Sequence, residues 1–288
     1  MMNNLKVTFL LVLLTLLFVA IGYTFGGRQG MIIAFGLAVV MNFFSYWFSD
    51  KIVLKMYRAR PADENKDRKL LAIVNQAAQA GFLPLPKVYV IPTRAPNAFA
   101  TGRNKDHAAV AVTEGILDIL SADELEGVIG HELAHVKNRD ILIGSVVATV
   151  AGAIGIMASM ARWAAIFGGY GRSSDRDGGG PFGLLIMAIV APLAAMIIQM
   201  AISRTREYKA DRIGAAITGQ PLALASALEK LHKTPIRMKL DDRPATAHLF
   251  IAHPLSGKGI ARLLSTHPPG EERARRLEEL AATGLNID

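Results

Sequence analysis

The sequence contains no cysteine among its 288 residues. This absence excludes a disulfide framework and a zinc site built from thiolates. Any zinc ion would have to be held by histidine and carboxylate side chains. The chain also lacks a stripe of lysine and arginine interleaved with aromatic residues, so its net charge of +8 does not indicate nucleic-acid binding.

Charge is almost absent from four long stretches, which predict membrane-spanning helices. The first two cover residues 5–25, where Lys6 is the one charged residue, and residues 31–48. A second pair covers residues 141–160 and 182–203. Their lengths are suited to crossing a bilayer. A cleaved signal peptide is the alternative for the first stretch, and a buried soluble hairpin is the alternative for the second pair.

These stretches divide the chain into four parts. Residues 1–48 and 141–203 are expected to form two transmembrane hairpins, whereas residues 49–140 and 204–288 are rich in charge and are expected to be soluble. Positive residues next to membrane spans favour the cytoplasmic side, so both soluble parts should face the cytoplasm. The residues that carry this argument are Lys51, Lys55, Arg58, Lys137, Arg139, Arg204 and Arg206.

The soluble parts predict a mainly helical domain with a small β-sheet. Apolar spacing and turn residues indicate which segments are regular. Helices are expected at 63–80, 113–120, from about 122 onward, and at 206–217, 221–231 and 271–282; strands are expected at 87–91, 97–101 and 108–112.

The segment His131-Glu132-Leu133-Ala134-His135 carries the clearest chemical pattern in the chain. On a helix, histidines four residues apart project from the same face and can bind one zinc ion, with Glu132 beside it to act on water. A capping box at Ser121 and Glu124 predicts that a helix begins just before this segment. The alternative is a helix that holds two histidines by chance.

A catalytic zinc ion usually has three protein ligands and one open position. Glu207 and Asp211 are four residues apart, just after the last uncharged stretch and on the same expected side of the membrane. Glu207 can complete the ligand set, and Asp211 can orient a ligand imidazole. The alternative is a solvated helix on which these carboxylates pair with neighbouring arginines.

The chain resembles the HtpX family of membrane-bound zinc metalloproteases, which is related to the CAAX prenyl-protein endopeptidases. Five segments carry the resemblance in the family's order. They are NAFATG at 97–102, HELAHVKNRD at 131–140, SRTREYKAD at 203–211, PATAHLFIAHPL at 244–255 and STHPPGEERARRL at 265–277.

The resemblance implies a zincin-like α+β domain that faces the cytoplasm of a bacterial inner membrane. It implies one zinc ion per chain, bound by His131, His135 and Glu207, with Glu132 as the catalytic base. Its substrates would be unfolded or misfolded membrane proteins, cleaved under stress. The lipid bilayer would be its other partner, and the sequence makes no prediction of oligomeric state.

Three further assignments rest on the same resemblance. The strand that includes Asn97 would lie along the cleft, where a sheet edge can pair with an extended substrate. His267 would stabilise the oxyanion, although an ordinary loop histidine explains it as well. Arg275 or Arg276 would anchor the C-terminal segment to the site.

Two other functions remain open from the sequence. An intramembrane zinc protease is disfavoured because Lys137, Arg139 and Asp140 follow the motif directly, and charges are costly at bilayer depth. A membrane scaffold or chaperone with a structural zinc ion would need a fourth protein ligand, for which His267 is the candidate.

Overall fold

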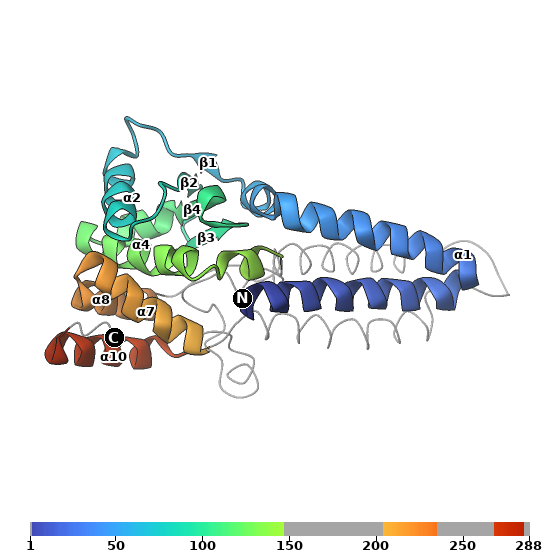
Figure 1. Cartoon of the computed structure of the whole chain (residues 1–288). Helices are drawn as coiled ribbons and strands as arrows, with labels where there is room; N and C mark the ends of the chain where they lie inside the picture. The colour runs from blue at the N-terminus through green and yellow to red at the C-terminus, as the bar shows by residue number, and fades with distance from the viewer. Residues whose placement is uncertain (1, 147–203, 235–267, 285–288) are drawn as a thin grey trace, which may run out of the picture.

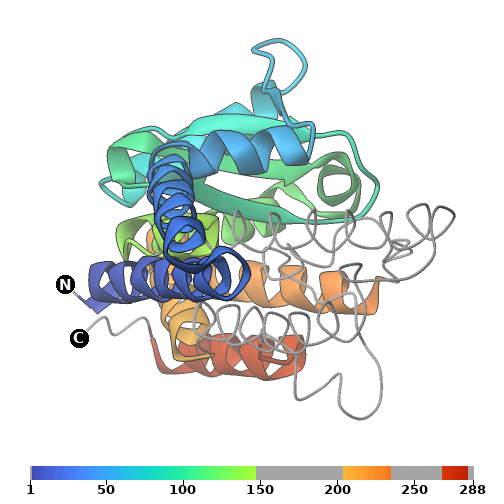
Figure 2. The ribbon, with the colours of Figure 1, turned by 90° about the vertical axis from the view of Figure 1, so that its right-hand side faces the viewer.

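The computed structural model describes residues 2–146, 204–234 and 268–284. An α/β body lies at one end, and helix α1 (Met2–Met56) extends from it as a long hairpin (Figures 1 and 2). The expected mainly helical fold with a small sheet is therefore confirmed. The other helices are α2 (Arg68–Ala80), α3 (Glu114–Ile119), α4 (Ala122–Lys137), α7 (Arg204–Thr218), α8 (Pro221–Lys233) and α10 (Gly270–Thr283).

Helix α1 turns back on itself at a pair of glycines. Gly26 and Gly27 leave helical geometry, and Gly27 has a φ of 56°, which glycine adopts at little cost. The two arms pack closely, since a Cβ atom on Gly22 would lie 2.4 Å from the carbonyl oxygen of Gly30. Asn42 then donates a hydrogen bond of 2.8 Å to the Thr15 hydroxyl on the other arm.

The surface of α1 is strongly apolar. Its second part, Gly26–Met56, is the one helix among the described residues that is long and apolar enough to cross a membrane, and Val7–Ala20 forms a shorter apolar helix. Large side chains on the hairpin point outward, among them Phe9, Leu16, Ile33, Phe35, Leu37, Phe43 and Trp47. The expected spans 141–160 and 182–203 lie outside the described residues, apart from a helical start at 141–146.

The sheet has four strands in the order β1-β2-β4-β3. Strand β2 (Lys87–Ile91) runs parallel to β4 (Ala108–Thr113), and both β1 (Arg60–Pro61) and β3 (Ala98–Gly102) are antiparallel to their neighbours. A short 3₁₀ helix, η1 (Lys105–His107), lies in the connection between β3 and β4. Strand β3 therefore forms one edge of the sheet.

The two faces of the sheet bury alternate residues of each strand, as the strand period of two requires. One set packs with α2, α4, α7 and α8 in the main core and includes Val90, Val110 and Val112. The other set packs against the end of α1, where Phe99 lies 5.6 Å from the ring of Tyr57. The sheet thus connects the α1 hairpin on one of its faces to the layer of helices on the other.

Helix α2 begins later than the sequence predicts, at Arg68 instead of residue 63. The Asp63 carboxylate accepts hydrogen bonds of 2.9 Å from the backbone N–H groups of Asn65 and Lys66, which makes a local turn. Asp67 forms an ion pair of 2.6 Å with Arg60. These contacts also support strand β1, which the sequence analysis does not predict.

Helix α4 begins with the predicted capping box between Ser121 and Glu124. Glu124 also reaches helix α8, where it accepts hydrogen bonds of 2.6 Å from Ser226 and 2.7 Å from Lys230. Burial raises the pKa of Glu124, but these bonds outweigh it and lower the pKa to about 2. One carboxylate therefore fixes both the start of α4 and its packing on α8.

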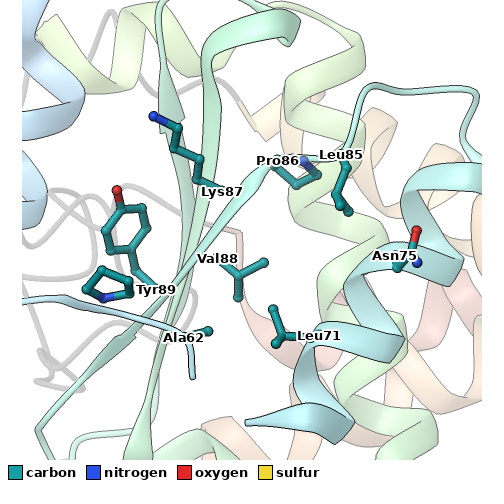
Figure 3. A pocket seen from close by; sticks show the side chains of 9 residues that line it. Ala62, Leu71, Asn75, Leu85, Pro86, Lys87, Val88 and Tyr89 are labelled. Atoms are coloured by element: carbon teal, nitrogen blue, oxygen red, sulfur yellow. The ribbon is translucent and has the colours of Figure 1, made fainter. Parts of the chain in front are cut away.

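A pocket lies between α2 and strand β2, on the side of β2 away from β4 (Figure 3). Leu71, Val88 and Pro86 are among the residues that line it. It includes none of the His131, His135 or Glu207 side chains, so it is separate from the candidate site described next.

Candidate metal centre

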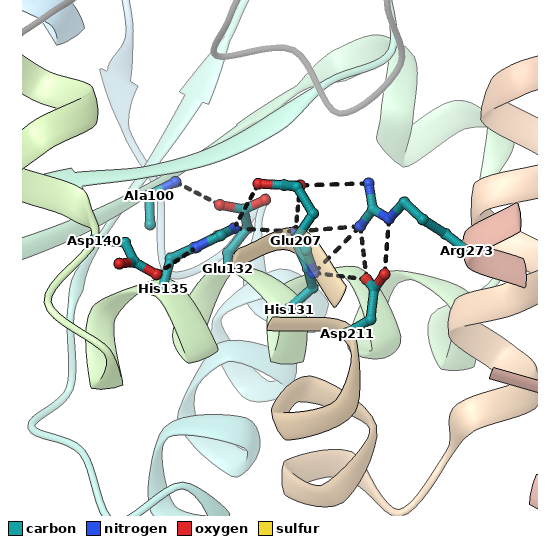
Figure 4. Close-up of polar contacts among 8 residues, drawn as sticks. All are labelled: Ala100, His131, Glu132, His135, Asp140, Glu207, Asp211 and Arg273. Carbon is teal, nitrogen blue, oxygen red and sulfur yellow. Dashed lines mark hydrogen bonds and ion pairs between the residues drawn. The ribbon is translucent and has the colours of Figure 1, made fainter. Parts of the chain in front are cut away.

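Helix α4 presents His131 and His135 on one face, and their Nε2 atoms lie 3.2 Å apart (Figure 4). His131 is buried and His135 is partly exposed. Helix α7 crosses α4 at this point because both helices have a glycine there. A Cβ atom on Gly130 would lie 2.8 Å from the Gly214 carbonyl oxygen.

This close crossing brings Glu207 of α7 to the two imidazoles. Its carboxylate oxygens lie 3.7 Å from Nε2 of His131 and 3.7 Å from Nε2 of His135. One donor atom from each of the three residues lies within 4.8 Å of the others. Two imidazoles and a carboxylate are ligands that zinc accepts, so the residues fit the metal that the sequence predicts.

A carboxylate faces the far nitrogen of each histidine. Nδ1 of His131 lies 2.9 Å from Asp211 Oδ1, and Nδ1 of His135 lies 3.3 Å from Asp140 Oδ2. Such contacts fix the imidazole rings with Nε2 toward the metal position. Burial lowers the pKa of His135, but Asp140, Glu207 and Glu132 outweigh burial and raise it to about 9.

Arg273 of α10 places a positive charge against the carboxylates of Asp211 and Glu207. It was not among the site residues predicted from the sequence. Its side chain is 1% exposed and donates two hydrogen bonds to Asp211, of 2.8 Å from Nε and 2.7 Å from Nη2. Nη1 lies 3.6 Å from Glu207. Burial raises the pKa of Asp211, but the adjacent guanidinium outweighs this and holds it below its usual value.

Arg275 and Arg276, either of which the resemblance offers as an anchor of the C-terminal segment to the site, both lie on the outer face of α10. Arg275 pairs with Glu272 and Glu279. Arg276 stacks over the ring of Tyr208, 3.8 Å from its centre, so it anchors α10 to α7 at the surface. The sequence did contain a signal for Arg273, because Ala274 and Leu277 mark the buried face of this helix.

Glu132 lies between the histidines and the edge strand of the sheet. Its carboxylate accepts a hydrogen bond of 2.8 Å from the backbone N–H of Ala100 on β3 (Figure 4). Burial raises the pKa of Glu132, and the two histidines partly offset this effect. A buried carboxylate with a raised pKa is suited to accept and return a proton.

Asn97 and His267 are the two remaining residues that the sequence placed near the cleft. Asn97 is buried just before β3, and its backbone N–H donates a hydrogen bond of 2.8 Å to the Thr113 hydroxyl. It therefore lies at the start of the strand that passes beside Glu132. His267 is outside the residues that the structure describes.

The sequence matches the model of peptidase family M48 over residues 64–281. The chain belongs to peptidase family M48. A protease HtpX homolog of Desulfatibacillum aliphaticivorans is 57% identical over 275 residues, which cover 96% of this chain and 89% of the relative. A protease HtpX homolog of Thermococcus sibiricus is 53% identical over 274 residues, 94% of each chain.

A solved structure shares the fold. The crystal structure of S. mikatae Ste24p matches with a TM-score of 0.51 and 17% identity, over 93% of this chain and 62% of that chain. The expected family is thus confirmed, and the M48 chain is a membrane metalloprotease of the HtpX type. Its three metal-ligand candidates come from α4 and α7, which both lie within the matched region.

Proposed function

We propose that this M48 chain is a zinc-dependent endopeptidase, with one zinc ion bound by His131, His135 and Glu207. The observation that carries the proposal is the convergence of these three side chains, within 4.8 Å, beside the Glu132 carboxylate. Asp211 and Asp140 would orient the two imidazoles. This arrangement has the ligand number of catalytic zinc sites, which keep one coordination position open.

Zinc held there would supply Lewis-acid chemistry that lowers the pKa of water and polarises the scissile carbonyl. Glu132 takes a proton from the attacking water and passes it to the departing amine. Strand β3 has no further strand beside it in the described part of the chain, so its outer edge can pair with an extended substrate. Asn97 lies at the start of this edge and would contact the substrate there.

We also propose that the enzyme works in the bacterial inner membrane and faces the cytoplasm. The hairpin α1 supports the membrane location, and the basic residues Lys51, Lys55 and Arg58 at its end support the orientation. Because the hairpin packs on the sheet that carries β3, the site would receive segments close to the bilayer. Misfolded or exposed segments of membrane proteins, accumulating under stress, are the substrates that fit this position.

A scaffold with a structural zinc ion is the second candidate. Structural sites fill all four positions with protein ligands. In the described part of the chain the metal-ligand group contains three residues, with the Glu132 carboxylate beside them. This arrangement favours the enzyme. Cleavage inside the bilayer is disfavoured by Lys137, Arg139 and Asp140 next to the motif.

The first test uses detergent-purified protein, stripped with a chelator and then given zinc. We would measure bound zinc and the cleavage of an unfolded protein. The wild type should bind one zinc ion and cleave, whereas Glu207→Ala should do neither. Glu132→Gln should keep its zinc and lose activity by about 10²-fold or more, because the proton acceptor is gone.

Glu229→Ala is the matched control, because Glu229 is a surface glutamate on α8 that pairs with Lys233. It should bind zinc and cleave as the wild type does. Proteolysis by clean Glu132→Gln protein would contradict the assigned base. Normal zinc binding by Glu207→Ala would contradict the third ligand, and zinc binding without any cleavage by the wild type would favour the scaffold.

A further inference from the structure

The last turns of α1, which lie beside the sheet in Figure 1, have a basic face as well as a buried one. Val53 and Leu54 are buried against the sheet. Trp47, Lys51 and Lys55 are exposed instead. Because these three residues are spaced by four, they lie along one side of the helix. The exposed side of α1 therefore changes from aromatic to basic over about one turn.

A second basic side chain reaches this face from the sheet. Arg103 follows the last residue of β3, and its guanidinium lies over the Trp47 ring, 4.6 Å from the ring centre. The Lys51 ammonium lies 5.4 Å from the centre of the Phe48 ring. Cation–π contacts of this kind use the ring faces and leave N–H donors available. In the described part of the chain, no carboxylate pairs with Arg103 or Lys51.

The contact between Arg103 and Trp47 indicates where a bilayer around α1 would end. A guanidinium is costly in hydrocarbon, whereas tryptophan and arginine are both stable at the membrane interface. Lys51 lies four residues beyond Trp47, about 6 Å further along the helix axis. The headgroup layer on each side of a bilayer is about 5–7 Å thick. Lys51 would therefore lie within the layer that holds the lipid phosphates, with Arg103 at its inner boundary.

Basic residues outnumber acidic ones around this contact. Residues 50–58 and 103–107 contain two carboxylates, Asp50 and Asp106, against five basic residues, which are Lys51, Lys55, Arg58, Arg103 and Lys105. Asp50 is partly buried and lies about 100° around the helix from its neighbour Lys51. Clusters of four to eight basic residues beside a membrane helix attract anionic lipids. The charge at the end of α1 therefore complements anionic headgroups.

We propose that Arg103 and Lys51 form a binding site for the phosphate headgroup of an anionic phospholipid, at the junction of α1 and the turn after β3. The planar guanidinium can donate two parallel hydrogen bonds to one phosphate, and the Lys51 ammonium adds a second charge. This inference rests on the proposed membrane location of α1. It gives the end of β3 a fixed depth at the bilayer surface, because Arg103 directly follows that strand.

The test measures the contact of lipids with Trp47. Trp163→Phe leaves Trp47 as the single tryptophan of the full-length protein, which is then placed in phosphatidylcholine vesicles. Increasing fractions of phosphatidylglycerol or of phosphatidylcholine, each brominated on its acyl chains, quench the fluorescence of a tryptophan in contact with them. Brominated phosphatidylglycerol should reach half-maximal quenching at a mole fraction about tenfold or more below that of brominated phosphatidylcholine.

Lys51→Gln should lower this preference by about fivefold, and Arg103→Gln with Lys51→Gln should abolish it, because each basic residue contributes about fivefold. The matched control is Arg68→Gln with Lys69→Gln. It removes the same two charges from exposed positions at the start of α2, on the other face of the sheet. The control should keep the wild-type preference, and an equal loss in both double variants would overturn the site.

A second arm separates a lipid from a free anion. Inorganic phosphate is added to the vesicles and compared with chloride at the same ionic strength. Both salts should leave the same preference for phosphatidylglycerol, because the bilayer holds its headgroups beside Arg103 and Lys51. Selective loss of the preference in inorganic phosphate would show a site for the free anion and would overturn the assignment to lipid.

The same measurements separate this inference from the proposed function. If neither brominated lipid quenches Trp47, α1 is not in the bilayer, and the proposed membrane location fails together with the lipid site. If both lipids quench Trp47 equally, the membrane location stands and the headgroup site fails.

Discussion

Arg273 connects helix α10 to the candidate metal centre, although it is not one of the three candidate ligands. It is the most buried charged side chain near the site, and it bonds to Asp211, which in turn faces Nδ1 of His131. The three residues come from α10, α7 and α4. The orientation of His131 therefore depends on the packing of a helix close to the C-terminus.

Arg273→Met should weaken zinc binding by about 10- to 100-fold, which is the usual effect of losing a group that supports a ligand. It should also cost about 3–5 kcal/mol of stability, because it leaves the Asp211 carboxylate buried with less compensation. Zinc titration and denaturant unfolding would measure both effects. Adding Asp211→Asn should recover part of the stability, since that buried charge is then removed.

The control for this prediction is Arg275→Met. Arg275 is on the exposed face of α10 and pairs with Glu272 and Glu279, and exposed pairs contribute about 0–1 kcal/mol. This variant should bind zinc as the wild type does. Wild-type zinc affinity in Arg273→Met would show that Asp211 orients His131 without the arginine.

At the scale of elements, sequence patterns placed most helices well because their signals are local. The capping box at Ser121 and Glu124 predicts the start of α4, and apolar spacing predicts α7, α8 and α10 to within two residues at each end. The order of the strands was not predicted, because pairing depends on contacts between segments distant in the sequence. Ala274 and Leu277 mark the buried face of α10 in the sequence, but the contact of this face with the site was not predicted, for the same reason.

The candidate ligand set could be selected from the sequence because chemistry restricts zinc ligands to few residue types. With no cysteine in the chain, histidine and carboxylate were the remaining candidates, and four-residue spacing selected His131 with His135. Glu207 was selected because it was expected on the same side of the membrane as His131 and His135. The contact of Glu132 with Ala100 required knowledge that β3 lies beside α4, which no local pattern contains.

The crossing of α4 and α7 depends on glycine, and this gives a prediction at the scale of elements. A Cβ atom on Gly214 would lie 2.6 Å from the His131 backbone nitrogen and 2.8 Å from the Gly130 carbonyl carbon. Gly214→Ala must therefore move the helices apart. Overpacking of this kind costs about 1–3 kcal/mol, and displacing Glu207 by about 1 Å could lower kcat/KM by about 10²-fold.

Thermal unfolding, zinc titration and peptide cleavage would measure these effects of Gly214→Ala. The matched control is Gly36→Ala in α1, where an added Cβ atom would meet nothing within 4 Å. This change should be neutral or slightly stabilising, because alanine favours a helix more than glycine does. Equal behaviour of the two variants would refute the dependence of the site on this crossing.

For the whole molecule, the proposed orientation places the α/β body and the tip of the α1 hairpin on opposite sides of the membrane. Arg28 lies at the exposed tip of the hairpin, and Glu64 lies on an exposed loop of the body. The sequence contains no cysteine, so a single introduced thiol reports its own position without background. A membrane-impermeant maleimide can then determine the orientation directly.

In cells with an intact inner membrane and a permeable outer membrane, Arg28→Cys should react with the impermeant maleimide. Glu64→Cys should react only after the inner membrane is opened, because the body that carries His131 and Glu207 faces the cytoplasm in the proposed orientation. A membrane-permeant maleimide should label both variants and serves as the control for thiol reactivity. Labelling of Glu64→Cys in intact cells, with Arg28→Cys protected, would place the metal centre outside the cytoplasm and exclude cytoplasmic segments of membrane proteins as its substrates.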